Sequence, residues 1–217
     1  ASTPGANTLI LGSENRTVLA KVTSITNANQ DPNGSSVPTG KSDIGQFKFS
    51  AAAHNNSKDG LNDFILSGII FNITATNVLI DSTSWLFFNK GDATITQACT
   101  AASTSDTTLG TFSGSYLVRC QGLKASTVNT EIDQGTDQTF VLQGDITNPV
   151  VASNATSTLQ VSIQNFDRLS RGRFVATSAG SHIEWQDNDG STATGSNPNF
   201  TWIEFPETTI KSTSYQS

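Results

Sequence analysis

Residues 64–80 read FILSGIIFNITATNVLI, and this stretch decides the fold class. Every second residue from Ile69 to Ala75 is apolar, so these side chains share one side of an extended chain. A period of two with many β-branched and aromatic residues is typical of a β-strand. The stretch is longer than an ordinary strand, and Gly68 is a candidate position for a β-bulge within it.

The same pattern recurs along the rest of the chain. No apolar stripe with helical spacing continues for more than two turns, and Gly, Asn, Asp and Pro separate the alternating segments. We expect an all-β fold, specifically an Ig-like or jelly-roll-like antiparallel β-sandwich of about ten strands in a single domain. The expected strands are 18–23, 46–51, 64–80, 85–88, 94–99, 115–121, 139–142, 158–163, 173–177, 182–186, 200–205 and 209–215.

The first thirty or so residues are predicted to be distinct from the body of the sandwich. We divide the chain into an N-terminal segment, 1–30, and a body, 31–217, which begins with the turn-rich run DPNGSSVPTGK. A strand tethered by such a loop can pair with its own sheet or with that of a neighbouring copy, and the sequence leaves both arrangements open. The donor-strand candidates are Leu9, Ile10, Leu11, Val18, Ala20 and Val22.

The composition indicates an exported protein. The chain has no methionine and begins Ala1-Ser2-Thr3, so we expect that a leader has been removed. Only 14% of residues are charged, whereas 12 Phe and 3 Trp can form a packed core. The surface is therefore expected to consist mainly of Ser, Thr and Asn, and the location to be extracellular or at the cell surface.

Charge and hydropathy argue against two classes of partner. The net charge is −6, and the 12 Lys and Arg residues are scattered, whereas nucleic-acid binding needs a dense basic face. No apolar run approaches the ~18 residues needed to cross a bilayer. We therefore expect no nucleic-acid partner and no membrane span in the mature chain.

Cys99 and Cys120 are the only two cysteines. Both lie at strand-like positions that flank a polar, turn-rich stretch, and we expect a disulfide that closes a hairpin between 94–99 and 115–121. A loop of about 20 residues makes such a bond worth ~3 kcal/mol in the chain-entropy model. The spacing differs from C-x-x-C, which disfavours redox and zinc roles.

The sequence holds no convincing catalytic signature. His54 and His182 are the only histidines, and no G-x-S-x-G elbow is present. Paired acids such as Glu184 and Asp187 could serve glycoside hydrolysis in principle. However, Glu184 and its neighbour Trp185 are expected on opposite faces of a strand. We therefore expect no enzymatic activity and no catalytic residues.

One short run resembles the start of an oxygen-rich calcium loop, namely Asp187-Asn188-Asp189-Gly190. The twelfth position counted from Asp187 is Pro198, so the EF-hand pattern fails. Asp and Asn before Gly also favour ordinary turns. No cofactor is required by the sequence, and calcium at Asp187 and Asp189 is the one candidate.

Two kinds of glycan interaction are conceivable. Exposed aromatics could form a carbohydrate-binding platform, although core packing is the default for those inside strands; the candidates are Trp85, Trp185, Trp202 and Tyr215. N-x-[ST] sequons could accept N-linked glycans, with Asn33, Asn55 and Asn154 in expected loops. The six sequon residues are Asn15, Asn33, Asn55, Asn72, Asn154 and Asn199.

Three segments resemble strands of secreted β-sandwich proteins from prokaryotic cell surfaces, namely Val18–Ile25, TDQTFVLQGDI (136–146) and TLQVSI (158–163). The W-x-D element at 185–187 and the T-W-I element at 201–203 are similar to elements near the ends of those proteins. The resemblance implies a subunit of a surface layer, stalk or pilus-like filament, some of which polymerise by donor strands. We therefore expect a structural subunit that joins head to tail with copies of itself. The alternative is a monomeric carbohydrate-binding or adhesin module.

Overall fold

The computed structural model describes residues 22–29, 36–53, 63–101, 110–123, 126–149, 156–163, 183–187, 201–202, 209–212 and 214–217. Within these ranges the chain forms antiparallel strands and no α-helix, which confirms the all-β prediction. The described strands number 14, against the roughly ten expected for a sandwich. Part of the difference comes from strands only two residues long, which are β6, β8, β12, β13 and β14.

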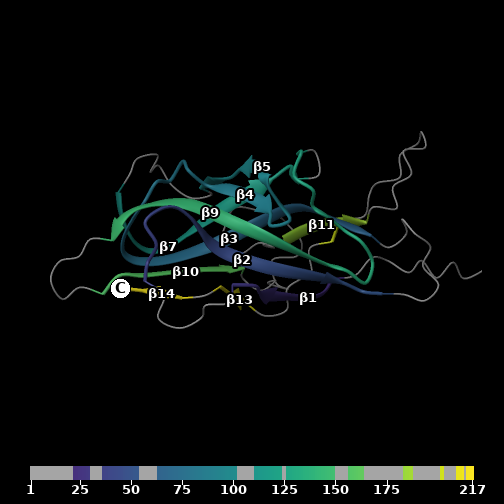
Figure 1. Cartoon of the computed structure of the whole chain (residues 1–217), viewed down its shortest axis with the longest axis horizontal. Helices are drawn as coiled ribbons and strands as arrows, with labels where there is room; N and C mark the ends of the chain where they lie inside the picture. The colour runs from purple at the N-terminus through teal and green to yellow at the C-terminus, as the bar shows by residue number, and fades with distance from the viewer. Residues whose placement is uncertain are drawn as a thin grey trace, which may run out of the picture.

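The strands in chain order are β1 (Val22–Asn27), β2 (Gly40–Ala51), β3 (Phe64–Ile80), β4 (Leu86–Asn89), β5 (Asp92–Ala98), β6 (Thr100–Ala101), β7 (Gly110–Gln121), β8 (Glu131–Ile132), β9 (Asp137–Pro149), β10 (Thr158–Ile163), β11 (Ile183–Asp187), β12 (Thr201–Trp202), β13 (Ile210–Lys211) and β14 (Tyr215–Gln216). All of them belong to one hydrogen-bonded sheet. One path through it runs β1-β2-β9-β3-β10-β13 (Figure 1).

Strand β9 makes this sheet fold over itself into a nearly barrel-like form. One side of β9 pairs with β2, while the other side pairs first with β4 and then, near its end, with β3. We call β1-β2-β9-β4-β5 the first half-sheet, and β7-β3-β10 with β13 and β14 the second half-sheet. The two halves share the corner at β9 and β3, so their inner sides face each other across the core.

Phenylalanine rings fill the space between the two half-sheets. Phe47 of β2 stacks on Phe71 of β3 with ring centroids 5.8 Å apart, and Phe71 lies 6.4 Å from Phe87 of β4. Within the first half-sheet, Phe49 and Phe140 meet edge to face at 5.5 Å. All five rings are fully buried. Burial of each contributes about 1.5–3 kcal/mol, so these rings are a substantial part of what stabilises the core.

Trp85 shows how a glycine in β9 makes room for a large side chain. The indole is fully buried and lies over Gly144, where an added Cβ would be only 2.8 Å from Trp85 Cζ3. Real carbon atoms do not approach so closely, so a larger residue at position 144 would displace the ring. The glycine within β9 therefore has a packing reason.

Strand β3 is a single strand of 17 residues, and it contains the expected bulge. Its pairing with β11 shifts register where Glu184 opposes Gly68 and Trp185 opposes Leu66, which leaves Ser67 as the extra residue. The core-facing side consequently changes from even-numbered residues before the bulge to odd-numbered residues from Ile69 to Ala75, and a second register shift returns it to even numbers at Val78 and Ile80. The alternating 69–75 segment is buried on its odd side, as the sequence predicted.

The hairpin expected between 94–99 and 115–121 is wrong in its pairing. Strand β5 folds back on β4 through the turn at 90–91, and the short β6 pairs with β7 instead. The chain thus passes from the first half-sheet to the second at Cys99. A turn of two residues after β4 fixes β4 as the partner of β5, because an antiparallel neighbour is closed most readily by so short a connection.

The strand expected at 209–215 is divided into β13 and β14, which both pair with β10. Ser212 accounts for the interruption. Its backbone N–H donates to Val161 O at 2.8 Å, and its Oγ accepts from Val161 N–H at 3.0 Å. A side-chain oxygen therefore replaces one backbone acceptor of the ladder, and the tail still follows β10 to its end.

Candidate functional site

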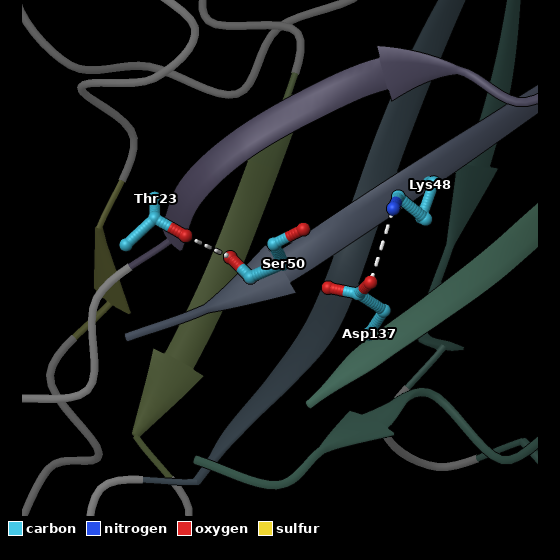
Figure 2. A network of polar contacts seen from close by, with 4 residues as sticks. All are labelled: Thr23, Lys48, Ser50 and Asp137. Atoms are coloured by element: carbon cyan, nitrogen blue, oxygen red, sulfur yellow. Dashed lines mark hydrogen bonds and ion pairs between the residues drawn. The ribbon is translucent and has the colours of Figure 1, made fainter. Parts of the chain in front are cut away.

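Strand β1 is an outer edge of the first half-sheet. Among the described strands it pairs with β2 alone, and its Val22 and Ile25 are 3% and 6% exposed in the core. Thr23 Oγ1 also donates to Ser50 O at 3.1 Å (Figure 2). Val22 therefore pairs within its own chain. The other donor-strand candidates, Leu9, Ile10, Leu11, Val18 and Ala20, lie outside the described residues.

A polar network supports the sheet beside β1 (Figure 2). Lys48 Nζ lies 3.0 Å from Asp137 Oδ2, with both side chains about half exposed. Hydrogen bonds from Ser50 and then Lys48 lower the pKa of Asp137 below its ordinary value. Since exposed pairs of this kind contribute at most about 1 kcal/mol, the network adds alignment between β2 and β9 more than stability.

The C-terminal residues hold the segment that follows β1. Tyr215 is buried, and its hydroxyl accepts from Asn29 Nδ2 at 2.8 Å and donates to Asp43 O at 3.2 Å. Nearby, Val37 N–H donates to Ser217 Oγ at 2.8 Å. Strand β13 also lies close to β1, although no described ladder joins them. The edge at β1 is thus closed by core packing, by the tail and by β13.

Strand β5 forms the opposite edge of the first half-sheet, and it differs from β1 in its burial and in the contacts that cover it. Among the described strands it pairs with β4 alone, and none of its seven residues is buried. Ile95 is the one apolar side chain of β5 that packs partly against the core. After Asp92 the strand reads ATITQA, without charge or proline.

The backbone of β5 presents hydrogen-bonding groups on its outer side. Cys99 N–H donates to Trp85 O at 3.0 Å and the register with β4 is unbroken from 96 to 98, so Gln97 and Cys99 direct their backbone groups toward β4. Those of Thr96 and Ala98 consequently point away from the sheet. Side chains of β5 itself cover the two ends, because Asp92 accepts from Thr94 N–H at 3.2 Å and Gln97 donates to Ala98 O at 3.2 Å.

No described strand covers the middle of this edge, at Thr96. Protein edges are usually protected by charges, proline, bulges or a covering segment. Residues 93–98 have no charge and no proline, and their pairing with β4 is regular from 96 to 98, although the register shifts between Asp92 and Thr96. We call Thr94–Ala98 the open edge, which is a surface suited to receiving another strand.

The expected disulfide is present and lies at the root of the open edge. Cys99 and Cys120 are bonded, with their Cα atoms 4.5 Å apart and with 5% and 0% of each residue exposed. Cys99 directly follows β5, and Cys120 belongs to β7. The bond therefore fastens the end of β5 in the first half-sheet to the second half-sheet.

A group of three carboxylates is a candidate cation site that the sequence did not reveal. Ligand oxygens of Asp63, Glu131 and Asp133 all lie within 4.8 Å of one another. Asp63 is buried, and its Oδ1 accepts from Gln134 N–H at 2.8 Å. Oxygen ligands suit calcium, which takes about six to eight of them, so three side chains supply only part of a shell.

These acids come together because β8 pairs with the start of β3, where Glu131 opposes Ile65. The pairing is distant in sequence, so spacing alone could not indicate it. The predicted calcium ligands belong to the same end of the sheet, since the backbone of Asp187 opposes Phe64. The side chain of Asp187 and the whole of Asp189 lie outside the described residues.

A second charged pair flanks β3 further along. Arg119 of β7 opposes Ile70, and Glu184 of β11 opposes Gly68. Burial raises the pKa of Glu184, and the nearby Arg119 partly offsets that rise. Burial likewise lowers the pKa of Arg119, with Glu184 acting in the opposite direction. The environment of Glu184 thus disfavours its ionised form, in contrast to that of Asp137.

The aromatic platform is wrong for three of its four candidates. Trp85, Trp185 and Tyr215 are 0%, 6% and 8% exposed, and every aromatic side chain that the structure describes is buried. Trp185 packs edge to face on Phe64 at 5.5 Å. The contacts of its hydroxyl with Asn29 and Asp43 hold Tyr215 inside. The side chain of Trp202 lies outside the described residues.

Among the sequons, the structure describes only Asn72. It lies in β3 opposite Leu117 of β7 and Ser162 of β10, and its side chain is partly exposed. Asn15, Asn33, Asn55, Asn154 and Asn199 lie outside the described residues, as do His54 and His182. In the part of the chain that is described, no helix has the length and apolar character to cross a membrane.

Comparison with known proteins does not assign this chain to a family. No protein-family model matches it, and no curated protein sequence matches it. One solved structure, described as "AvmM Catalyzes Macrocyclization in Alchivemycin A Biosynthesis", is similar over 93% of this chain and 86% of that one. The identity is 7% and the TM-score is 0.28, too low to support an argument about fold or function.

Proposed function

We propose that this protein is a structural subunit of an extracellular filament, pilus-like fibre or surface layer, and not an enzyme. Each copy would donate part of its N-terminal segment as a β-strand to the next copy. Such contacts join different surfaces of the two partners, so they repeat head to tail and do not close. The partner is therefore a second copy of the same chain.

The position of β1 is the observation that carries this proposal. This strand is a sheet edge, and residues 1–21 directly precede it in the sequence. Those residues include the uncharged Thr8-Leu9-Ile10-Leu11, separated from β1 by more than one strand length of sequence. An extended segment covers up to ~3.3–3.6 Å per residue, so residues 1–21 can reach ~70 Å. That distance is sufficient to cross to a neighbouring subunit.

Other features agree with a structural role outside the cell. The disulfide is buried and joins the two half-sheets, and disulfides persist mainly in oxidising compartments. The inner sides of the half-sheets face each other across one core, which supports the finer expectation of an Ig-like or jelly-roll-like sandwich. The alternative is a monomeric carbohydrate-binding or adhesin module. It is less well supported, because none of the aromatic side chains that the structure describes is exposed for a sugar to stack on.

Size-exclusion chromatography with light scattering tests the proposal on the full chain and on a chain that lacks residues 1–21. The full chain should form polymers whose mass rises with concentration, while the shortened chain should remain a folded monomer because β1 is retained. Thermal unfolding of both chains is the control for folding. A monomeric full chain, or equal polymers from both chains, would contradict strand donation.

A further inference from the structure

We propose that the open edge, Thr94–Ala98, is the acceptor for residues Thr8–Leu11 of a neighbouring copy. This inference rests on the proposed strand donation and identifies its receiving site. The incoming segment would pair with β5 as a further strand of the first half-sheet. Thr96 would provide the central N–H and C=O groups of the new ladder.

The choice of edge follows from comparing the two edges of the first half-sheet, β1 and β5. The outer side of β1 lies close to β13, which carries Lys211. Because β13 lies beside β1, a further strand could pair with the outer side of β1 only if the C-terminal tail moved. The open edge has neither a charge nor a covering strand among the described residues. It is therefore an edge at which an added strand displaces nothing that the structure describes.

The choice of occupant follows from composition and from the position of the chain. Thr8-Leu9-Ile10-Leu11 is uncharged, lacks proline and has high β-propensity, like Thr94-Ile95-Thr96. Side chains of such neutral strands can pair across a ladder without burying charge. An acidic or basic peptide would gain no complementary charge at this edge, so another segment of the same chain is the better match.

The geometry also favours a neighbour over the same copy. Strands β1 and β5 are opposite edges of the first half-sheet, with β2, β9 and β4 between them. Within one copy the segment would have to cross those three strands to reach β5. A neighbour placed edge to edge brings its own segment directly alongside β5, and the same contact can then repeat.

A lysine at the centre of the open edge tests the acceptor in the full-length protein. Thr96 is exposed, so Thr96→Lys adds charge without disturbing the core. Thr76→Lys is the matched control, because Thr76 is also an exposed strand threonine but lies on β3 and is paired with Thr158 of β10. We expect Thr96→Lys to raise the critical concentration for assembly at least about tenfold, and Thr76→Lys to leave it unchanged. Both variants should unfold at the temperature of the parent.

Cross-linking then identifies the occupant. Full chains with Ile10→Cys and full chains of different mass with Thr96→Cys are mixed and mildly oxidised. Disulfide-linked heterodimers should form, while mixing Ile10→Cys with Thr76→Cys should give at least about tenfold fewer.

The outcomes separate the two proposals. If loss of residues 1–21 prevents assembly but Thr96→Lys assembles like the parent and no heterodimer forms, the acceptor is overturned and strand donation stands. If the full chain never assembles, or assembles without residues 1–21, both are overturned. A chain that carries both Ile10→Cys and Thr96→Cys, stays monomeric and links these two positions internally would also overturn the acceptor, because the segment would then occupy its own edge.

Discussion

Strands β1 and β5 are both edges of the first half-sheet and have similar lengths, of six and seven residues. Strand β1 buries Val22 and Ile25 and lies beside the C-terminal tail, whereas β5 buries no residue. The difference teaches that an edge position does not by itself make a strand available for pairing. Core side chains and tail contacts fix β1 in its own subunit. The outer backbone groups of β5 are covered only at the ends of the strand, by the side chains of Asp92 and Gln97.

The largest expected effect concerns the covalent anchor of β5. Replacing both Cys99 and Cys120 with alanine should lower the free energy of unfolding by about 3 kcal/mol, because the closed loop restricts the unfolded chain. Unfolding in guanidinium chloride, followed by tryptophan fluorescence, measures the change. The parent protein unfolded and refolded with a reductant present is the control and should show a similar loss. A loss below about 1 kcal/mol would show that the two half-sheets hold β5 without the bond.

A matched pair of isoleucines measures the contrast between the two edges directly. Ile25→Ala in β1 should cost about 2.5 kcal/mol, because it leaves a cavity in the core. Ile95→Ala in β5 should cost less than about 1 kcal/mol, because that side chain is only partly buried. Chemical unfolding of both variants in the chain lacking residues 1–21 avoids any contribution from assembly. Equal costs, or a larger cost at Ile95, would mean that β5 is as firmly packed as β1.

The smallest expected effect concerns the ion pair beside β1. Asp137→Asn should lower stability by about 0.5 kcal/mol at neutral pH, since the pair is exposed and screened. The folded state lowers the pKa of Asp137 from its ordinary value of 3.8. Its contribution is therefore present above that value and is lost as the pH falls through the folded pKa.

The measurement is the difference in unfolding free energy between the parent and Asp137→Asn at pH 7 and at pH 2. The difference should shrink as the pH falls. Lys48→Gln is the matched control, because it removes the cation but keeps the carboxylate and its bond to Ser50. A difference that grows toward low pH would contradict the assigned sign.

Local sequence patterns were sufficient for individual strands and insufficient for their partners. Alternation located β3 and its buried side, and the cysteine positions indicated the disulfide. The pairing of β5 with β4, however, depends on a turn and on the whole sheet, which alternation does not encode. The carboxylate group of Asp63, Glu131 and Asp133 arises from a pairing between distant segments. The burial of Tyr215 likewise depends on contacts with Asn29 and Asp43, far away in sequence.

Hydrogen exchange at the amide of Thr96 tests the central claim most directly. This amide points away from β4, so it should exchange quickly in the monomeric chain that lacks residues 1–21. In the assembled full chain it should exchange at least about a hundredfold more slowly, because a neighbour's strand accepts its hydrogen bond. The same fast exchange in both proteins would contradict joining of copies at this edge.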